Sequence, residues 1–310
     1  MREKLLEFCN KWKMELKEQV PLSEHTTFRI GGNADYWIEI EHPQLLLKML
    51  VLSDLLHVCK KNAIPYFVMG KGSNILATDD GFRGLVIHMG NGFSDIHEGD
   101  EIPFEVGLSL MKASKYAEEH GLTGMEGLSG IPGTVGGALY MNAGAYGYEM
   151  SQIVTGCTYL DENGDLKKMD ADELQLSYRH SYFMEHPGNV IVSVSVSLDD
   201  DKKPDVSARM RDFLARRNEK QPLNYPSAGS TFKRPEVGYA SQLIDECGLK
   251  GYTVGGAQVS EKHAGFVINR NHATFADVMQ LCEDVRRIVK EQKGISLELE
   301  PIILGTYQKE

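Results

Sequence analysis

The chain has few cysteines, and none of them is placed to bind a metal. Its 310 residues include five cysteines spread over the whole sequence, Cys9, Cys59, Cys157, Cys247 and Cys282. No two of them form a CxxC pair, and no cysteine and histidine have a spacing that suits zinc. We therefore expect no metal site, and reduced, mostly buried thiols in a reducing compartment.

Long apolar runs are also missing. The first twenty residues are amphipathic and lack the apolar core and cleavage site of a signal peptide. The most apolar stretch, Leu45–Val58, contains Lys48 and Asp54, so it is too polar to span a bilayer. The formal net charge of −11 argues against nucleic acid and anionic membranes as main partners. These features predict a cytoplasmic protein without nucleic-acid or membrane partners, and they leave its oligomeric state open.

Helix and strand patterns follow one another without the regular βαβα order of a doubly wound sheet, which predicts an α+β fold. Apolar spacing predicts helices over residues 1–20, 43–62, 109–120, 205–220, 240–247 and onward from Thr274, where Asp277 completes a capping box. Strands are expected over 36–40, 65–69, 85–88, 152–161, 190–198 and 295–304. Valine and serine alternate in 190–198, which indicates one exposed and one buried face.

The charged run Asp199–Pro204, which ends in proline, is the best linker candidate. We therefore expect an N-terminal helix over residues 1–20, one domain over 21–202 and a second domain over 203–310. The chain contains no internal repeat and no low-complexity segment.

Two glycine-rich segments are candidates for binding phosphate. Gly70-Lys71-Gly72-Ser73-Asn74 follows an apolar strand, and glycines there allow backbone N–H groups to converge on an anion. The alternative is an ordinary turn at the end of a strand. The span Gly124–Gly147 holds eight glycines, which are costly to order unless the backbone approaches a ligand closely. No GxxxxGK[ST] occurs, and neither segment fits GxGxxG, so a P-loop is excluded and a Rossmann site is the weaker interpretation.

Three polar positions outside these loops are candidates for chemistry. Arg179, in SYRHS, has the planar guanidinium that binds a carboxylate through two hydrogen bonds, although an isolated arginine more often forms a surface ion pair. Ser230 lies in a small-residue turn, where a serine more often caps the turn. Glu298 and Glu300 alternate on the last predicted strand, or form its solvated edge. The sequence contains no nucleophile elbow, which argues against acyl-transfer hydrolysis.

Several segments, in the correct order, resemble those of the UDP-N-acetylenolpyruvoylglucosamine reductase (UDP-N-acetylmuramate dehydrogenase) family. They are HTTFRIGGNADYW, GKGSNIL, GLSGIPGTVGGALYMNAGAYG, SYRHS, AGSTFKRP, AGFVIN and the C-terminal strand, and they extend from about Leu22 to Gly305. The resemblance implies a FAD-binding fold of the vanillyl-alcohol-oxidase (PCMH) type, followed by a C-terminal α+β substrate-binding domain.

The resemblance also implies that both glycine-rich loops hold FAD. Within the matching motifs no histidine or cysteine indicates a covalent link, so we expect non-covalent FAD, with NADPH as co-substrate. The residues expected to hold the cofactor are Gly70, Lys71, Gly72, Ser73, Asn74, Ser129, Gly130, Ile131, Pro132, Gly133, Val135, Gly136, Gly137, Asn142, Gly144 and Ala145.

The implied reaction reduces the enolpyruvyl group of a UDP-sugar, in peptidoglycan precursor synthesis. Hydride passes from reduced flavin N5 to C3 of the enolpyruvyl group, and Ser230 matches the family's proton donor to C2. Arg179 and Glu300 match the residues that stabilise the developing enolate charge, which requires Glu300 to be protonated or hydrogen-bonded. Lys233, Arg234 and Lys262 are expected to contact the substrate.

The sequence departs from the family pattern at three points. Pro301 and Ile302 follow Glu300 where a small β-branched residue and a basic residue are usual, so Glu298 remains an alternative to Glu300. Arg234 stands where an amide side chain often contacts substrate. The stretch between Arg179 and Ser230 is short, which indicates the shorter class without the extra tyrosine-bearing loop.

Two other functions compete with the reductase. One is a FAD-dependent oxidase of the same fold that acts on another alcohol or sugar. The other is a flavin- or nucleotide-binding protein without turnover. The segments SYRHS and AGSTFKRP count against the oxidase, because they match the substrate side of the reductase. The joint presence of Arg179, Ser230 and Glu300 counts against a protein without turnover.

Overall fold

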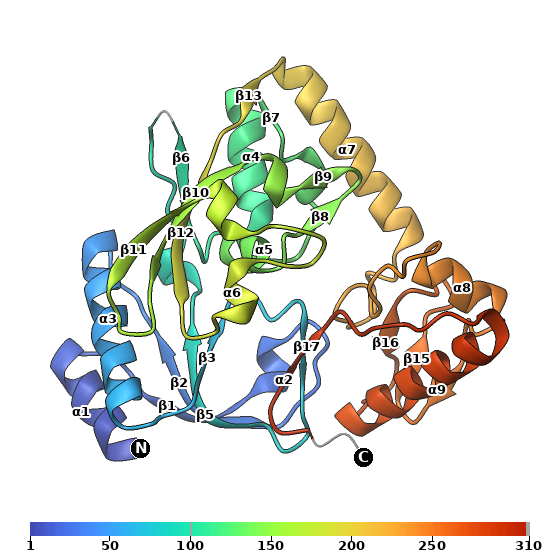
Figure 1. The fold of residues 1–310 in the computed structure, drawn as a ribbon, viewed down its shortest axis with the longest axis horizontal. Helices are drawn as coiled ribbons and strands as arrows, with labels where there is room; N and C mark the ends of the chain where they lie inside the picture. Colours follow the sequence, from blue (N-terminus) through green and yellow to red (C-terminus); the bar gives the residue numbers. More distant parts are fainter. Residues whose placement is uncertain (100, 308–310) are drawn as a thin grey trace. The chain divides into compact units, whose positions relative to one another are not determined.

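The computed structural model describes residues 1–99 and 101–307, which group into two compact units (Figure 1). Unit 1 comprises residues 1–18, 36–71 and 84–215, and unit 2 comprises 19–35, 72–83 and the chain from Arg216 onward. Each unit has its own apolar core. The chain passes between the units five times. Four passages lie within β1 (Lys17–Pro21), β2 (Asn33–Glu39), β5 (Phe82–His88) and α7 (Lys203–Lys220), and the fifth lies in the loop between Lys71 and Gly72.

Unit 1 contains most of the helices and strands. Its helices are α1 (Arg2–Trp12), α3 (Leu45–Lys61), α4 (Leu110–His120), α5 (Val135–Tyr140) and α6 (Tyr182–Glu185). Its strands are β3 (Tyr66–Met69), β6 (Ile102–Glu105), β7 (Leu122–Thr123), β8 (Gly144–Ala145), β9 (Tyr148–Glu149), β10 (Val154–Leu160), β11 (Leu166–Asp170), β12 (Val190–Val196) and β13 (Asp199–Asp200). Strand β3 pairs in parallel with β5.

The central sheet of unit 1 has the order β11-β10-β12-β6, with every pair antiparallel. The predicted strand at 190–198 is confirmed as β12, but the prediction of one exposed face is wrong. Ser193 is only 7% exposed, and Ser195 is the one residue of β12 that is not fully buried. Strand β12 lies between β10 and β6, so neither of its edges is open, and α5 packs against it; six of its seven residues are buried.

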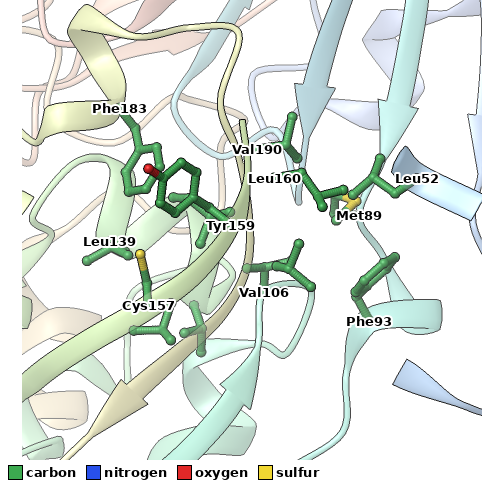
Figure 2. Packing of buried hydrophobic residues seen from close by; sticks show 14 of the residues in the cluster. Leu52, Met89, Phe93, Val106, Leu139, Cys157, Tyr159, Leu160, Phe183 and Val190 are labelled. Carbon is green, nitrogen blue, oxygen red and sulfur yellow. The ribbon is translucent and has the colours of Figure 1, made fainter. Parts of the chain in front are cut away.

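The apolar core of unit 1 lies beside helix α5. Figure 2 shows Leu139 of α5 close to Cys157 of β10 and to Phe183 of α6. The ring of Phe183 meets that of Tyr159 edge to face, with centroids 5.5 Å apart. Helix α6 and the strands β6 and β12 also pack against α5 and hold it in place. Four of the five cysteines in the chain are buried, as predicted.

Unit 2 combines short strands with two longer helices. Its elements are α2 (Leu22–His25), β4 (Ile75–Ala77), α8 (Ala240–Glu246), β14 (Thr253–Val254), β15 (Ala257–Val259), β16 (Val267–Asn269), α9 (Phe275–Lys293) and β17 (Ile302–Leu304). Strands β14, β15 and β16 form an antiparallel sheet, and α9 packs on β14 and β15. The predicted capping box is confirmed, because Thr274 and Asp277 each accept the other's backbone N–H at 3.0–3.1 Å.

Two predictions about element bounds are wrong, and the linker candidate contains a short paired strand. The N-terminal helix ends at Trp12 and does not reach residue 20, because Lys13 takes a left-handed conformation (φ 56°) and a strand begins at Lys17. The linker candidate is ordered, because Asp199 and Asp200 form β13 and pair with β7. The final strand covers only Ile302–Leu304 of the predicted 295–304.

Proline explains the shortened final strand. Residues 298–300 pair with 231–233 through the hydrogen bonds Lys233 N–H to Glu298 O (2.9 Å) and Glu300 N–H to Thr231 O (3.0 Å). Pro301 has no N–H to donate, and the chain beyond it pairs with β4 instead. Extended backbone therefore continues through Pro301 but changes partner there.

The predicted division into domains at 21–202 and 203–310 remains a proposal. In the described chain, the change from unit 1 to unit 2 falls inside α7, between residues 215 and 216. No helix of residues 1–99 and 101–307 combines the length and apolar character needed to cross a bilayer.

Candidate functional site

Glu126 fixes the start of the second glycine-rich segment. Its carboxylate is almost fully buried and accepts hydrogen bonds from the N–H of Gly124 (2.8 Å) and the hydroxyl of Thr123 (2.7 Å). Arg209 of α7 donates to the same carboxylate at 2.6 Å. The carbonyl of Glu126 accepts the hydroxyl of Ser129 at 2.7 Å, so Ser129 is buried and bonded within the loop.

The end of the same segment is held by backbone pairing. Three hydrogen bonds of 2.8–3.1 Å join the stretch Gly133–Gly136 to the stretch Val106–Leu110, which connects β6 to α4. Gly133, Val135 and Gly136 therefore belong to a fixed piece of backbone. Such a piece is pre-organised for a ligand, because no further ordering is needed when the ligand binds.

The glycines of this segment have different reasons for being glycine. A Cβ atom at Gly136 would lie 2.7 Å from the Val106 side chain, and one at Gly127 would overlap the carbonyl of Ala145. Close packing against the protein therefore accounts for these two. At Gly137, which is exposed, a Cβ would find only the Thr134 hydroxyl, at 3.5 Å. Close approach of a ligand, which the sequence analysis gave as the reason for the whole span, is thus not needed at Gly127 and Gly136.

The two glycine-rich loops meet within unit 1. A Cβ atom at Gly70 would lie 2.6 Å from the hydroxyl oxygen of Thr134, so the backbone of Gly70 lies directly against the Thr134 side chain. Partial burial and the nearby charge of Lys112 lower the pKa of Lys71. In the described part of the chain neither lysine has a carboxylate within 4.0 Å. Two positive charges without an acidic partner beside paired glycine loops are suited to an anionic group.

The remaining part of the first loop, Gly72–Asn74, belongs to unit 2. The side-chain amide of Asn74 donates to the carbonyl of Glu300 at 3.3 Å, and its own carbonyl accepts the N–H of Ile302 at 2.9 Å. The structure therefore brings this part of the loop next to Glu300, one of the predicted catalytic residues.

Arg179 lies beside the second loop in unit 1. It occupies a tight turn closed by two backbone hydrogen bonds between Ser177 and His180, and it adopts a positive φ of 54°. The side chain of Asn142, which is buried, donates to the carbonyl of Ser177 at 3.0 Å and accepts the N–H of Ser151 at 2.9 Å. The Arg179 guanidinium is 3.5 Å from the carbonyl of Asn142. The turn is thus fastened to the segment 142–145, where cofactor contacts are predicted.

Ser230 lies in unit 2, on a turn between two buried residues. Ala228 and Thr231 are both buried, and Gly229 between them has a φ of 77°, which favours glycine. The Ser230 side chain is exposed at this fixed turn. Because the N–H of Glu300 donates to the carbonyl of Thr231, Ser230 and Glu300 lie on neighbouring, paired segments.

The two candidate glutamates differ in their surroundings. The Glu298 side chain is 74% exposed and lies 3.6 Å from the amino group of Lys233. Glu300 is half-buried, and its backbone is bonded to both Thr231 and Asn74. The environment of Glu300 supports the register chosen from the sequence.

The predicted substrate-binding side chains are all in unit 2. Besides Lys233, they are Arg234, whose guanidinium stacks over the ring of Tyr239 at 4.6 Å, and Lys262, whose amino group donates to the carbonyl of Asn218 at 2.7 Å. Arg179 belongs to unit 1, and the other two predicted catalytic residues, Ser230 and Glu300, belong to unit 2.

Two positions that the sequence analysis did not single out also hold these loops. Glu126 was missed because its partner Arg209 lies 83 residues away. Thr27 was missed because its hydroxyl bonds to Ser227, 200 residues away. The available signal was that both are polar residues inside short motifs that contain glycine, GMEGLSG and HTTFRIGG.

Comparisons with known proteins match both halves of the chain. The family model for "UDP-N-acetylenolpyruvoylglucosamine reductase, C-terminal domain" matches residues 221–304, and the model for "FAD binding domain" matches residues 51–170. UDP-N-acetylenolpyruvoylglucosamine reductase from Agathobacter rectalis is 43% identical over 308 residues, covering 95% of this chain and 96% of that protein. The protein of the same name from Caldanaerobacter subterraneus is 42% identical, covering 98% and 97%.

A solved structure agrees with these matches. UDP-N-acetylenolpyruvylglucosamine reductase from Thermus caldophilus superposes with a TM-score of 0.78 at 31% identity, over 94% of this chain and 99% of that one. The predicted fold class is confirmed: a FAD-binding fold of the vanillyl-alcohol-oxidase type with a C-terminal α+β domain. The chain belongs to the UDP-N-acetylenolpyruvoylglucosamine reductase family.

Proposed function

We propose that this chain is an NADPH-dependent flavoenzyme that reduces the enolpyruvyl group of UDP-N-acetylglucosamine-enolpyruvate, giving UDP-N-acetylmuramate for peptidoglycan synthesis. The observation that carries the proposal is the match of residues 221–304 to the C-terminal domain of the reductases, beside the match of 51–170 to a FAD-binding domain. An oxidase on the same flavin scaffold would account for the second match alone.

The glycine-rich loops fit a phosphorylated flavin. Gly70 and Thr134 bring the loops together, Gly137 leaves open space, and Lys71 and Lys112 supply positive charge without acidic partners among the described residues. We assign the diphosphate of non-covalent FAD to this part of unit 1. When bound, FAD takes hydride from NADPH and supplies it to C3 of the enolpyruvyl group.

Ser230 is the proposed proton donor to C2. A serine hydroxyl is a poor acid in water, so it donates only to a strongly basic carbon held close to it. The buried neighbours Ala228 and Thr231 fix the turn and leave the hydroxyl of Ser230 exposed, which suits this task. The Ser230 hydroxyl needs no general base, because it donates a proton and is reprotonated from solvent afterwards.

Arg179 and Glu300 are the proposed stabilisers of charge. A guanidinium binds a carboxylate through two parallel hydrogen bonds and lowers the energy of the negative charge that develops as C3 is reduced. Glu300 must act in a protonated or hydrogen-bonded form, because a second anion would oppose the reaction. Lys233, Arg234 and Lys262 are proposed contacts for the sugar nucleotide, whose diphosphate is anionic. The cytoplasmic location remains a prediction from the sequence.

Anaerobic half-reactions test the proposed function. Purified protein should be yellow, should release FAD on denaturation and should lose its flavin absorbance when NADPH is added. Addition of the enolpyruvyl UDP-sugar in the absence of oxygen should then restore the absorbance. If oxygen restores it and the sugar nucleotide does not, the protein is an oxidase; if the folded protein contains no flavin, the cofactor assignment is wrong.

A further inference from the structure

Thr27 joins two loops to which the proposed reaction assigns different tasks. Its hydroxyl donates a hydrogen bond of 2.7 Å to the carbonyl of Ser227, and its carbonyl accepts the N–H of Ser227 at 3.2 Å. Its own N–H donates to the carbonyl of Gly72 at 3.3 Å. One residue thus bonds to the turn that carries Ser230 and to the loop Gly72–Asn74, all within unit 2.

The segment around Thr27 is itself firmly anchored. Phe28 and Ile30 are buried in the core of unit 2, and the carbonyl of Phe28 accepts the side-chain amide of Asn269 at 3.3 Å. Gly72 takes a φ of 60°, and a side chain at this position would overlap the carbonyl of His25. The loop and the segment are therefore in close contact, and only glycine fits between them.

A displacement of Thr27 would move both loops, because Thr27 is hydrogen-bonded to each of them. The Thr27 hydroxyl bonds to the carbonyl of Ser227, which is three residues before the proposed proton donor, and also lies 3.4 Å from the carbonyl of Ser73 in the proposed FAD loop. The backbone N–H of Thr27 bonds to Gly72 in the same loop. We propose that Thr27 is a positioning residue that ties the FAD loop to the turn carrying Ser230, so that cofactor binding and protonation depend on one hydroxyl. This inference rests on the proposed function, because it takes FAD as the ligand of the loop.

The hydroxyl is the group to remove. Thr27→Val keeps the shape of the side chain and deletes the donor, and Thr27→Ala deletes it without adding a methyl group where the hydroxyl was. Thr27→Ser retains the donor and serves as the rescue variant. Thr253→Val is a control in the same unit, because the hydroxyl of the exposed Thr253 also donates to a backbone carbonyl, that of Gly251 at 2.9 Å, and accepts the side-chain amide of Gln258 at 3.1 Å.

Two measurements on each variant test the proposal. The first is the dissociation constant of FAD for the apoprotein, followed by quenching of flavin fluorescence. The second is the anaerobic rate at which the UDP-sugar substrate reoxidises the reduced holoenzyme. We expect Thr27→Val and Thr27→Ala to raise the dissociation constant about five-fold and to slow reoxidation about ten-fold. Thr27→Ser and Thr253→Val should stay near the wild-type values.

Several outcomes would overturn the proposal. If only the melting temperature of the apoprotein falls and both measurements stay at wild-type values, Thr27 is a purely structural residue. If only one measurement changes, the two loops do not depend on a common hydroxyl. A wild-type holoenzyme that the substrate fails to reoxidise would instead count against the proposed function, while the FAD titration of Thr27→Val would still test the bond to the cofactor loop.

Discussion

Arg209 and Glu126 form an ion pair of 2.6 Å in which the carboxylate is only 1% exposed. The pair joins α7 to the start of the glycine-rich segment, since Glu126 also accepts the N–H of Gly124 and, through its carbonyl, the hydroxyl of Ser129. Burial alone would raise the pKa of Glu126, but hydrogen bonds from Gly124, Thr123 and Arg209 outweigh it and place the pKa below its usual 4.5.

This pair gives a prediction about stability and pH. Arg209→Met leaves the buried charge of Glu126 without its cation, and we expect it to lower the free energy of unfolding by about 2–3 kcal/mol at neutral pH. Because the pKa of Glu126 is lowered by folding, its contribution is fully present above 4.5 and is lost as the pH falls through the folded-state pKa. Urea unfolding at several pH values should therefore show a wild-type advantage that shrinks in acid.

An exposed ion pair provides the control for this prediction. Arg287 and Asp284 are 3.4 Å apart, and the arginine side chain is largely exposed. Arg287→Met should change the unfolding free energy by less than about 1 kcal/mol. A loss as large as that of Arg209→Met would show that the effect comes from removing any arginine and not from the buried carboxylate.

Gly136 and Gly137 are adjacent, and replacing each by alanine tests a different property. Gly136→Ala tests packing, and Gly137→Ala tests ligand binding. Gly136→Ala places a methyl group 2.7 Å from the Val106 side chain, so we expect a lower melting temperature of the apoprotein. Gly137→Ala meets only the Thr134 hydroxyl, at 3.5 Å, so the apoprotein should stay as stable as the wild type. If FAD phosphate approaches Gly137, the same methyl group should weaken FAD binding at least about ten-fold. Thermal unfolding and FAD titration of both apoproteins measure this. Unchanged FAD affinity in Gly137→Ala would remove Gly137 from the cofactor site.

Ser230→Ala tests the proton donor separately from hydride transfer. Reduction of the bound flavin by NADPH should keep its wild-type rate, because Ser230 has no part in that step. Reoxidation by the UDP-sugar should slow by about 10²–10⁴-fold, the usual contribution of a positioned acid. Stopped-flow measurement of the two half-reactions distinguishes them, and wild-type rates in both would show that the serine is not the donor.

Local signals in the sequence were sufficient for elements whose bounds depend on nearby residues. Helix α4 begins after Ser109, whose hydroxyl accepts the N–H of Lys112, and ends at Gly121 in a left-handed conformation, as its sequence predicts. The capping box at Thr274 is confirmed for the same reason. The burial of β12 could not be read from its alternating pattern, because it depends on β6, β10 and α5, which cover it from other parts of the chain.

Some features of the candidate site could likewise be predicted from the sequence, and others could not. The glycine content located both loops, and family resemblance supplied Arg179, Ser230 and Glu300. The reason for individual glycines was not predictable, because Gly136 meets Val106, thirty positions earlier, and Gly70 meets Thr134. The contact made by Thr27 was not predictable either, because only the fold brings Ser227 beside its hydroxyl.

Thr231 directly follows the proposed proton donor, Ser230, in the chain, and it has a buried hydroxyl. It accepts the N–H of Val267 at 2.8 Å, while the backbone of Thr231 bonds to Gly265 and Glu300. Thr231→Val leaves that buried N–H without an acceptor, so we expect a loss of about 1–3 kcal/mol in unfolding free energy and slower reoxidation by substrate. Thr231→Ser keeps the acceptor and should lose about 1 kcal/mol at most, from one methyl group, with reoxidation near wild type. Urea unfolding and stopped-flow reoxidation of both variants measure this. Equal behaviour of the valine and serine variants would mean that packing by the methyl group, and not the hydrogen bond, holds the turn.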